Sequence, residues 1–141
     1  MTDMMDVKKK IREILLADSD IKEIVEDRVY IGWFERRFRL PCITIFDPSE
    51  LGEPAKLGGA QDQYVGVVQV DVWSRKSVER DKLARAVKKA LGNKANFKSM
   101  QASGFILGSP EVRTLDEIDV KPIIYRKSLR FTVLYWTESY V

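Results

Sequence analysis

Residues 129–135, which read Leu-Arg-Phe-Thr-Val-Leu-Tyr, decide the fold because apolar and polar side chains alternate along them almost without a break. This period of two predicts a β-strand, which we extend to about residues 124–137. Alternation this regular is typical of an antiparallel sheet with one covered and one polar face. The covered face carries Leu129, Phe131, Val133 and Tyr135, and the polar face carries Arg126, Ser128, Arg130 and Thr132.

A second strand with the same period is predicted over residues 64–74. Val68, Val70 and Val72 fall on one face, and Gln69 and Asp71 fall on the other. If the two long strands are neighbours, Asp71 and Arg130 are placed to pair across them. A third strand is predicted over 42–46, bounded by Pro41 and Asp47-Pro48, with weaker strand pieces over 105–107 and 112–115.

Helical periods occupy much of the remaining chain. Residues 3–17 have an amphipathic pattern, Asp18 or Ser19 caps a short helix, and Ser77 caps a helix that runs to Leu91 and stops at Gly92. We therefore expect an α+β fold, with a mainly antiparallel sheet of about four strands and two main helices packed on one face. The length of 141 residues suits a single domain spanning 1–141.

The composition argues against most kinds of enzyme. Histidine is absent and Cys42 is the single cysteine, which excludes Ser-His-Asp catalysis, an intrachain disulfide and a thiolate zinc site. Asp116, Glu117 and Asp119 form an acidic turn, but their spacing is not that of a calcium loop, and a solvated turn is the favoured interpretation. We expect no catalytic residue, no metal and no cofactor.

Several pieces of the chain resemble, in the same order, the tail completion proteins of tailed viruses, which are also called tail terminator or head-to-tail joining proteins. Each piece is a core or turn pattern, and together they cover nearly the whole chain. The pieces are Leu15-Leu16-Ala17-Asp18, Ile24-Val25-Glu26-Asp27-Arg28-Val29-Tyr30, Leu40-Pro41-Cys42-Ile43-Thr44-Ile45, Val68-Gln69-Val70-Asp71-Val72-Trp73-Ser74, Leu83-Ala84-x-Ala86-Val87-x-x-Ala90-Leu91, Arg113-Thr114-Leu115-Asp116-Glu117 and Arg126-Lys127-Ser128-Leu129-Arg130-Phe131.

The resemblance implies a structural protein of the virion tail. It implies a ring, expected to be a hexamer, at the head-proximal end of the tail, where it ends growth of the tail tube. The implied partners are other copies of the chain, the major tail tube protein and a head connector or neck protein, with DNA passing through the ring. Such rings bind no cofactor and catalyse nothing. We also expect assembly in the host cytoplasm and no contact with a membrane.

Three surfaces are candidates for these contacts. The first is an aromatic and arginine loop, because tryptophan and arginine are enriched where binding energy concentrates. The others are the polar sheet face and the loop over 48–63, and each of the three could instead be ordinary covered or solvated surface. The candidate residues are Trp33, Phe34, Arg36, Arg37 and Phe38 in the first loop, Asp71, Arg126 and Arg130 on the sheet, and Leu51, Lys56 and Leu57 in the second loop.

A small single-stranded nucleic-acid-binding module is the alternative function. It draws on Trp33, Phe34 and Phe38 among arginines, because bases stack on aromatic rings that are flanked by cations. Against this function, Ser128 and Thr132 stand on the last strand where stacking rings would be wanted.

Overall fold

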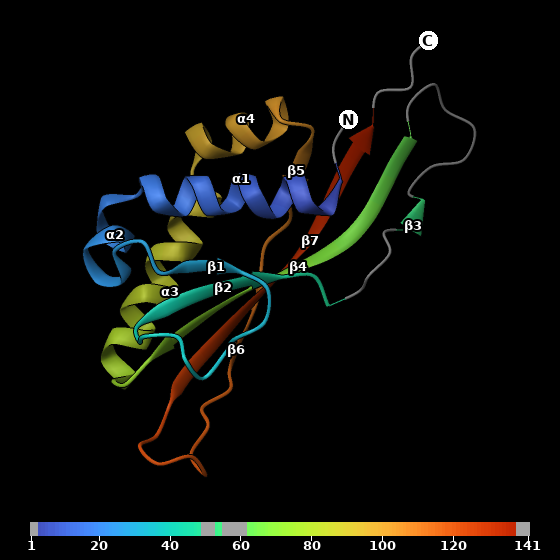
Figure 1. Cartoon of the computed structure of the whole chain (residues 1–141). Helices are drawn as coiled ribbons and strands as arrows, with labels where there is room; N and C mark the ends of the chain where they lie inside the picture. Colours follow the sequence, from blue (N-terminus) through green and yellow to red (C-terminus); the bar gives the residue numbers. More distant parts are fainter. Residues whose placement is uncertain (1–2, 49–52, 55–61, 138–141) are drawn as a thin grey trace.

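The computed structural model describes residues 3–48, 53–54 and 62–137. This part of the chain forms four helices and seven strands (Figure 1). The helices are α1 (Met4–Ala17), α2 (Ser19–Val25), α3 (Ser77–Gly92) and α4 (Lys94–Ala102). The strands are β1 (Val29–Ile31), β2 (Cys42–Phe46), β3 (Glu53–Pro54), β4 (Asp62–Ser74), β5 (Phe105–Leu107), β6 (Glu111–Thr114) and β7 (Tyr125–Thr137).

All seven strands join one sheet, in the order β1-β2-β4-β7-β5. The two long strands β4 and β7 are neighbours, a condition that the sequence leaves open, and they pair antiparallel along their whole length. β3 also pairs with β4, and β6 also pairs with β7. The fold class is confirmed as α+β.

The expectation of a mainly antiparallel sheet of about four strands needs correction, because the sheet is larger and mixed. β1 lies parallel to β2, with Val29 opposite Ile43 and Ile31 opposite Ile45. Parallel neighbours need a long connection, and residues 32–41 supply it. Three residues are too few to reveal an alternating pattern, which is why the sequence does not predict β1.

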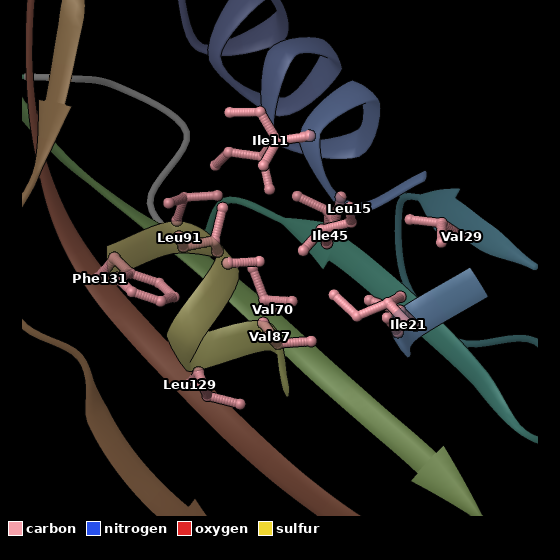
Figure 2. Close-up of a cluster of buried hydrophobic side chains, with 14 of the residues drawn as sticks. Ile11, Leu15, Ile21, Val29, Ile45, Val70, Val87, Leu91, Leu129 and Phe131 are labelled. Carbon is pink, nitrogen blue, oxygen red and sulfur yellow. The ribbon is translucent and has the colours of Figure 1, made fainter. Parts of the chain in front are cut away.

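The helices cover one face of the sheet and bury its apolar side chains there. Ile11 and Leu15 of α1 point toward Ile45 of β2, and Val87 of α3 lies beside Val70 and Leu129 (Figure 2). The two longest helices, α1 and α3, therefore pack on the same face, as expected. A chain of this size closes such a core without a disulfide.

Local contacts decide where the helices begin. Asp3 caps α1 in a reciprocal box with Asp6, in which the Asp6 amide donates to Asp3 Oδ1 at 2.9 Å. Asp18 caps α2, which decides between the two residues, Asp18 and Ser19, that the sequence offered. Ser77 is not the cap of α3: it is the first helical residue, and the N-cap position belongs to Lys76, whose side chain makes no cap bond.

The sequence does not predict α4. Asn93 caps it by accepting from the Asn96 amide at 2.8 Å, and α3 includes Gly92 instead of stopping before it. Met100 is the one residue of α4 that is fully buried. A helix with so small an apolar stripe leaves little periodic signal. Among the described residues, no helix is both long and apolar enough to cross a bilayer.

Candidate assembly surface

The face of the sheet that points away from the helices, here called the second face, carries the polar residues of β2, β4 and β7. Its central side chains are buried even though most of them are polar: Thr44 and Asp71 are 0% exposed, Trp73 is 1% exposed, and Gln69 and Ser128 are 4% exposed. Of the two interpretations of this face, ordinary solvated surface is therefore wrong for these positions. The connection from β1 to β2, residues 32–41, helps to cover them.

Aromatic rings attach this connection to the second face. Phe34 stacks on Trp73, with 4.1 Å between ring centroids, and Phe38 stacks on Tyr30 at 4.0 Å. Phe34 and Phe38 also meet edge to face at 5.9 Å. Gly32 begins the turn with φ of 123°, a conformation that other residues rarely adopt. Phe34 and Phe38 thus cover a second, smaller apolar cluster. The interpretation of this loop as a cover for the core edge, by Trp33 and Phe34, therefore holds for Phe34, whereas Trp33 is exposed.

Arg126 lies between two tryptophan rings. Its guanidinium carbon is 4.8 Å from the centroid of Trp73 and 5.2 Å from that of Trp33. Its Nε and Nη2 atoms donate to Asp71 Oδ2 at 3.0 and 2.7 Å. Such an arrangement combines a charge-assisted hydrogen bond pair with cation–π contacts in a place largely shielded from water.

Trp33 is the outermost member of this arrangement. It meets Phe46 edge to face at 4.7 Å and lies on Arg126, yet it remains 56% exposed. Contacts with Phe46 and Arg126 therefore fix the Trp33 side chain on one side, while its other side is open to solvent. Exposed, pre-organised tryptophan of this kind is typical of a binding hot spot.

The predicted pair between Asp71 and Arg130 is wrong. In the observed register Asp71 lies opposite Ser128, and Arg130 lies opposite Gln69. Arg130 donates to Gln69 Oε1 at 3.1 Å, and Gln69 Nε2 donates to Asp71 Oδ1 at 2.9 Å. The carboxylate of Asp71 therefore takes Arg126 as its ion partner and reaches Arg130 only through an amide.

The remaining candidate residues lie at the margin of the surface. Arg36 and Arg37 are exposed, and Arg37 pairs with Glu35 at 3.1 Å. The hydrogen bond that Arg37 donates to Glu35 raises the pKa of Arg37, so its charge is permanent. Leu51, Lys56 and Leu57 lie outside the described residues. The structure thus brings Trp33, Asp71 and Arg126 together. Phe46 and Trp73 were missed in the sequence analysis. Their only signal was their position two residues after Thr44 and Asp71, which places them on the same face of the strands.

The acidic turn after β6 has a structural use. Asp116 Oδ1 accepts from Arg80 Nη1 at 2.6 Å and from the amide of Arg126 at 2.9 Å. No group of three potential metal ligands occurs within the part of the chain that the structure describes.

Cys42 lies on the second face and is buried, and loss of hydration raises the pKa of its thiol to about 12.

The alternative function required free aromatic faces, and the structure places most of them in existing contacts. Phe34 lies on Trp73, and Phe38 lies on Tyr30 with Arg37 over its ring at 5.3 Å. Trp33 has Arg126 against its ring. Among the described residues, these rings do not form the row of open rings on which successive bases stack.

Comparison with known proteins gives two matches. The sequence model of the family described as "Tail completion protein gp17" matches residues 9–135. A chain in the solved structure described as "Virion of native gene transfer agent (GTA) particle" has a similar fold, with a TM-score of 0.62 and 15% identity over 93% of this chain and 95% of that chain. At this identity the likeness concerns the fold alone. No curated protein matches the chain.

Proposed function

This chain belongs to the tail completion protein family, and on that premise we propose that it forms a ring at the head-proximal end of a viral tail. Members of the family are structural virion proteins, so a structural role in tail assembly follows directly from membership. The proposed ring contains several copies, expected to be six. It ends growth of the tube, joins the major tail tube protein to the head connector or neck protein, lets DNA pass through its centre, and assembles in the host cytoplasm.

The extent of the family match carries this proposal. The match begins inside α1 and ends near the end of β7, so it includes the helical layer, the β4–β7 pair and the connection over the second face. A match limited to one helix and one strand would support only a fold.

The direct test is deletion of the gene in its virus or prophage. We expect unattached heads and tails of irregular length, whereas normal joined particles would remove the proposed function.

We further propose that the surface around Trp33 contacts a neighbouring subunit or the tail. The ring of Trp33 is half exposed, and Arg126 and Phe46 fix its position before binding. A side chain that is already ordered loses little entropy when it is covered. Its apolar area can therefore contribute directly to binding, by roughly 25 cal/mol per Å² removed from water.

Substitution Trp33→Ala tests this surface. We expect the variant to fold but to restore joined particles at least about tenfold less well than the wild-type gene, because removal of a hot-spot side chain costs about 2 kcal/mol or more of binding. Phe97→Ala on α4 is the matched control, because Phe97 is also a partly exposed aromatic residue, at 37%. The readouts are particle counts by electron microscopy and folding by circular dichroism. A Trp33→Ala monomer that unfolds would instead show that Trp33 belongs to the core.

A further inference from the structure

A cationic groove runs along the free edge of β1, the outermost strand of the sheet. Its volume is about 730 Å³. Four cationic side chains line it, and its single carboxylate, Glu35, already accepts from Arg37. The residues that line this cationic groove are Lys9, Arg12, Val29, Tyr30, Ile31, Glu35, Arg37, Phe38 and Arg39.

Between these cations, the groove is lined by apolar side chains. Ile31 of β1 is partly exposed, and the rings of Tyr30 and Phe38 stack on each other beside it. The side chain of Val29 is buried in the core, and its carbonyl accepts from Arg12 Nε at 2.7 Å. Strand β1 has no strand neighbour on its outer side within the described part of the chain. The cations come from α1 and from the connection after β1, and charges beside an edge strand discourage unwanted strand pairing. An apolar lining with a cationic surround also suits a partner that offers an apolar side chain flanked by carboxylates.

The opposite edge of the same sheet offers such a partner. Strand β6 pairs with β7 on the side away from β4, and the turn Glu117-Ile118-Asp119 follows it. Ile118 is 66% exposed, one of the most exposed large apolar side chains among the described residues. A carboxylate stands on each side of it in the sequence. The 117–119 turn therefore has the chemistry that complements the cationic groove.

Hydrogen bonds hold the start of the 117–119 turn in place. Asp116 Oδ1 accepts from Arg80 Nη1 and from the amide of Arg126. The amide of Glu117 donates to the Ile124 carbonyl at 2.8 Å. A turn that is ordered before it binds loses little conformational entropy on docking, so even one exposed isoleucine and two carboxylates can contribute usefully.

We propose that the 117–119 turn of one copy of this chain docks into the cationic groove of a second copy, with Ile118 on the apolar lining and Glu117 and Asp119 toward Arg37, Arg39 and Lys9. The proposal rests on the ring proposed above. Because groove and turn are different surfaces at opposite edges of one sheet, the contact is heterologous, and repeated copies of a heterologous contact close into a ring when the rotation allows. A nucleic acid is the weaker candidate, since Tyr30 and Arg37 already cover Phe38.

Zero-length cross-linking detects this contact even if it is weak. Lys9 supplies the one primary amine among the groove residues, and a carbodiimide joins amines to carboxylates that touch them. Wild-type chains labelled with ¹⁴N and ¹⁵N are mixed, cross-linked at high concentration and low salt, and digested for mass spectrometry. We expect peptides of mixed isotope that join Lys9 to Glu117 or Asp119. Mixed-isotope products that lack this pair, or no such products, would overturn the proposal.

Charge reversal makes the test directional. We expect Arg37→Glu/Arg39→Glu and Glu117→Lys/Asp119→Lys each to lower the yield of the Lys9 product at least about tenfold, because like charges then face each other. Mixed together, the two variants restore the product in one direction only: Lys9 comes from the chain with the normal groove, and the carboxylate comes from the chain with the normal turn. The control Arg85→Glu/Lys88→Glu changes exposed cations of α3 by the same charge and should match wild type.

The outcomes separate this contact from the function on which it rests. If the groove variant completes particles and cross-links like wild type, its cations only guard the edge strand, and the docking proposal fails while the ring remains. If the groove variant instead loses binding to a short DNA duplex and wild type gives no Lys9 product, the groove is a nucleic acid site and the proposal also fails. Normal particles from a virus that lacks the gene would remove the ring itself. Circular dichroism confirms that each variant folds.

Discussion

At the residue scale, Asp71 organises the second face. It is fully buried, and its two carboxylate oxygens take Gln69 and Arg126 separately. An ion pair in such a place adds little net stability, but removing one partner leaves the other charge without compensation. In the observed β4–β7 register, Trp73 lies opposite Arg126 and Asp71 lies opposite Ser128, and this alignment brings Asp71 and Arg126 within hydrogen-bond distance.

Substitution Asp71→Asn is expected to lower the free energy of unfolding by about 3 kcal/mol, because Arg126 keeps its charge in a buried place and loses its counter-ion. Arg130→Gln is the comparison, because Arg130 is exposed and reaches this network only through Gln69, so we expect a change below about 1 kcal/mol. Urea unfolding followed by fluorescence measures both. Equal effects of the two changes would contradict the assignment of Arg126 as the partner of Asp71.

At the scale of elements, charged side chains join α3 to β7 and to the turn after β6. Arg80 on α3 donates to Asp81 at 2.8 Å and also binds Asp116, and Lys127 of β7 pairs with Asp81 at 2.9 Å. The hydrogen bond from Arg80, followed by that from Lys127, lowers the pKa of Asp81 from 3.8 to about 2. This cluster holds the turn that carries Ile118 at a fixed place on the helix layer.

The depressed pKa of Asp81 predicts a pH dependence of stability. The folded protein holds Asp81 ionised more strongly than the unfolded chain does, so the contribution is complete above pH 3.8 and disappears as pH falls through about 2. The side chain of Asp81 is 44% exposed, so water screens the pairs and we expect less than about 1 kcal/mol. Wild type and Asp81→Asn should therefore differ above pH 3.8 and converge toward pH 2.

Urea midpoints measured across this pH range test that convergence. Glu23→Gln removes the same charge at an exposed position of α2 and controls for net charge. If Asp81→Asn differs from wild type by the same amount at every pH, the ion pairs with Arg80 and Lys127 do not stabilise the fold.

At the scale of the whole molecule, one sheet separates two kinds of interior. The core on the helix side consists of apolar side chains (Figure 2). The second face combines aromatic rings, an ion pair and a covering connection. Cys42 lies on the second face and is fully buried. Its thiol becomes accessible only when that cover or the whole sheet opens, so it reports on the integrity of this side.

Alkylation of Cys42 provides the whole-molecule measurement. Because burial raises its pKa to about 12, the native thiol carries almost no thiolate at pH 8 and should react with iodoacetamide far more slowly than the urea-unfolded chain. We expect the native rate to follow global unfolding and to rise in Asp71→Asn, whose stability is lower. Rapid alkylation of a chain that keeps its full circular dichroism signal would show that the second face opens independently of the core.

The sequence alone determined the features that depend on local periodicity and composition. The period of two along 64–74 and 124–137 required two covered strands, and the pattern of residues 3–17 required an amphipathic helix, because each face must meet a core or water. The order of these pieces carried the resemblance to the tail completion family, which the match over 9–135 confirms. The exclusion of histidine and disulfide chemistry also needed only the composition.

Only the tertiary structure decided which of these side chains meet. A shift of two residues in the β4–β7 register keeps every side chain on its face but changes its partner, so periodicity could not choose Arg126 over Arg130 for Asp71. The parallel strand β1, the burial of Phe34 and Phe38, and the exposure of Trp33 all depend on where residues 32–41 pack against distant strands. Contacts between residues far apart in the chain leave no local period, and they determine the surfaces through which this protein is proposed to assemble.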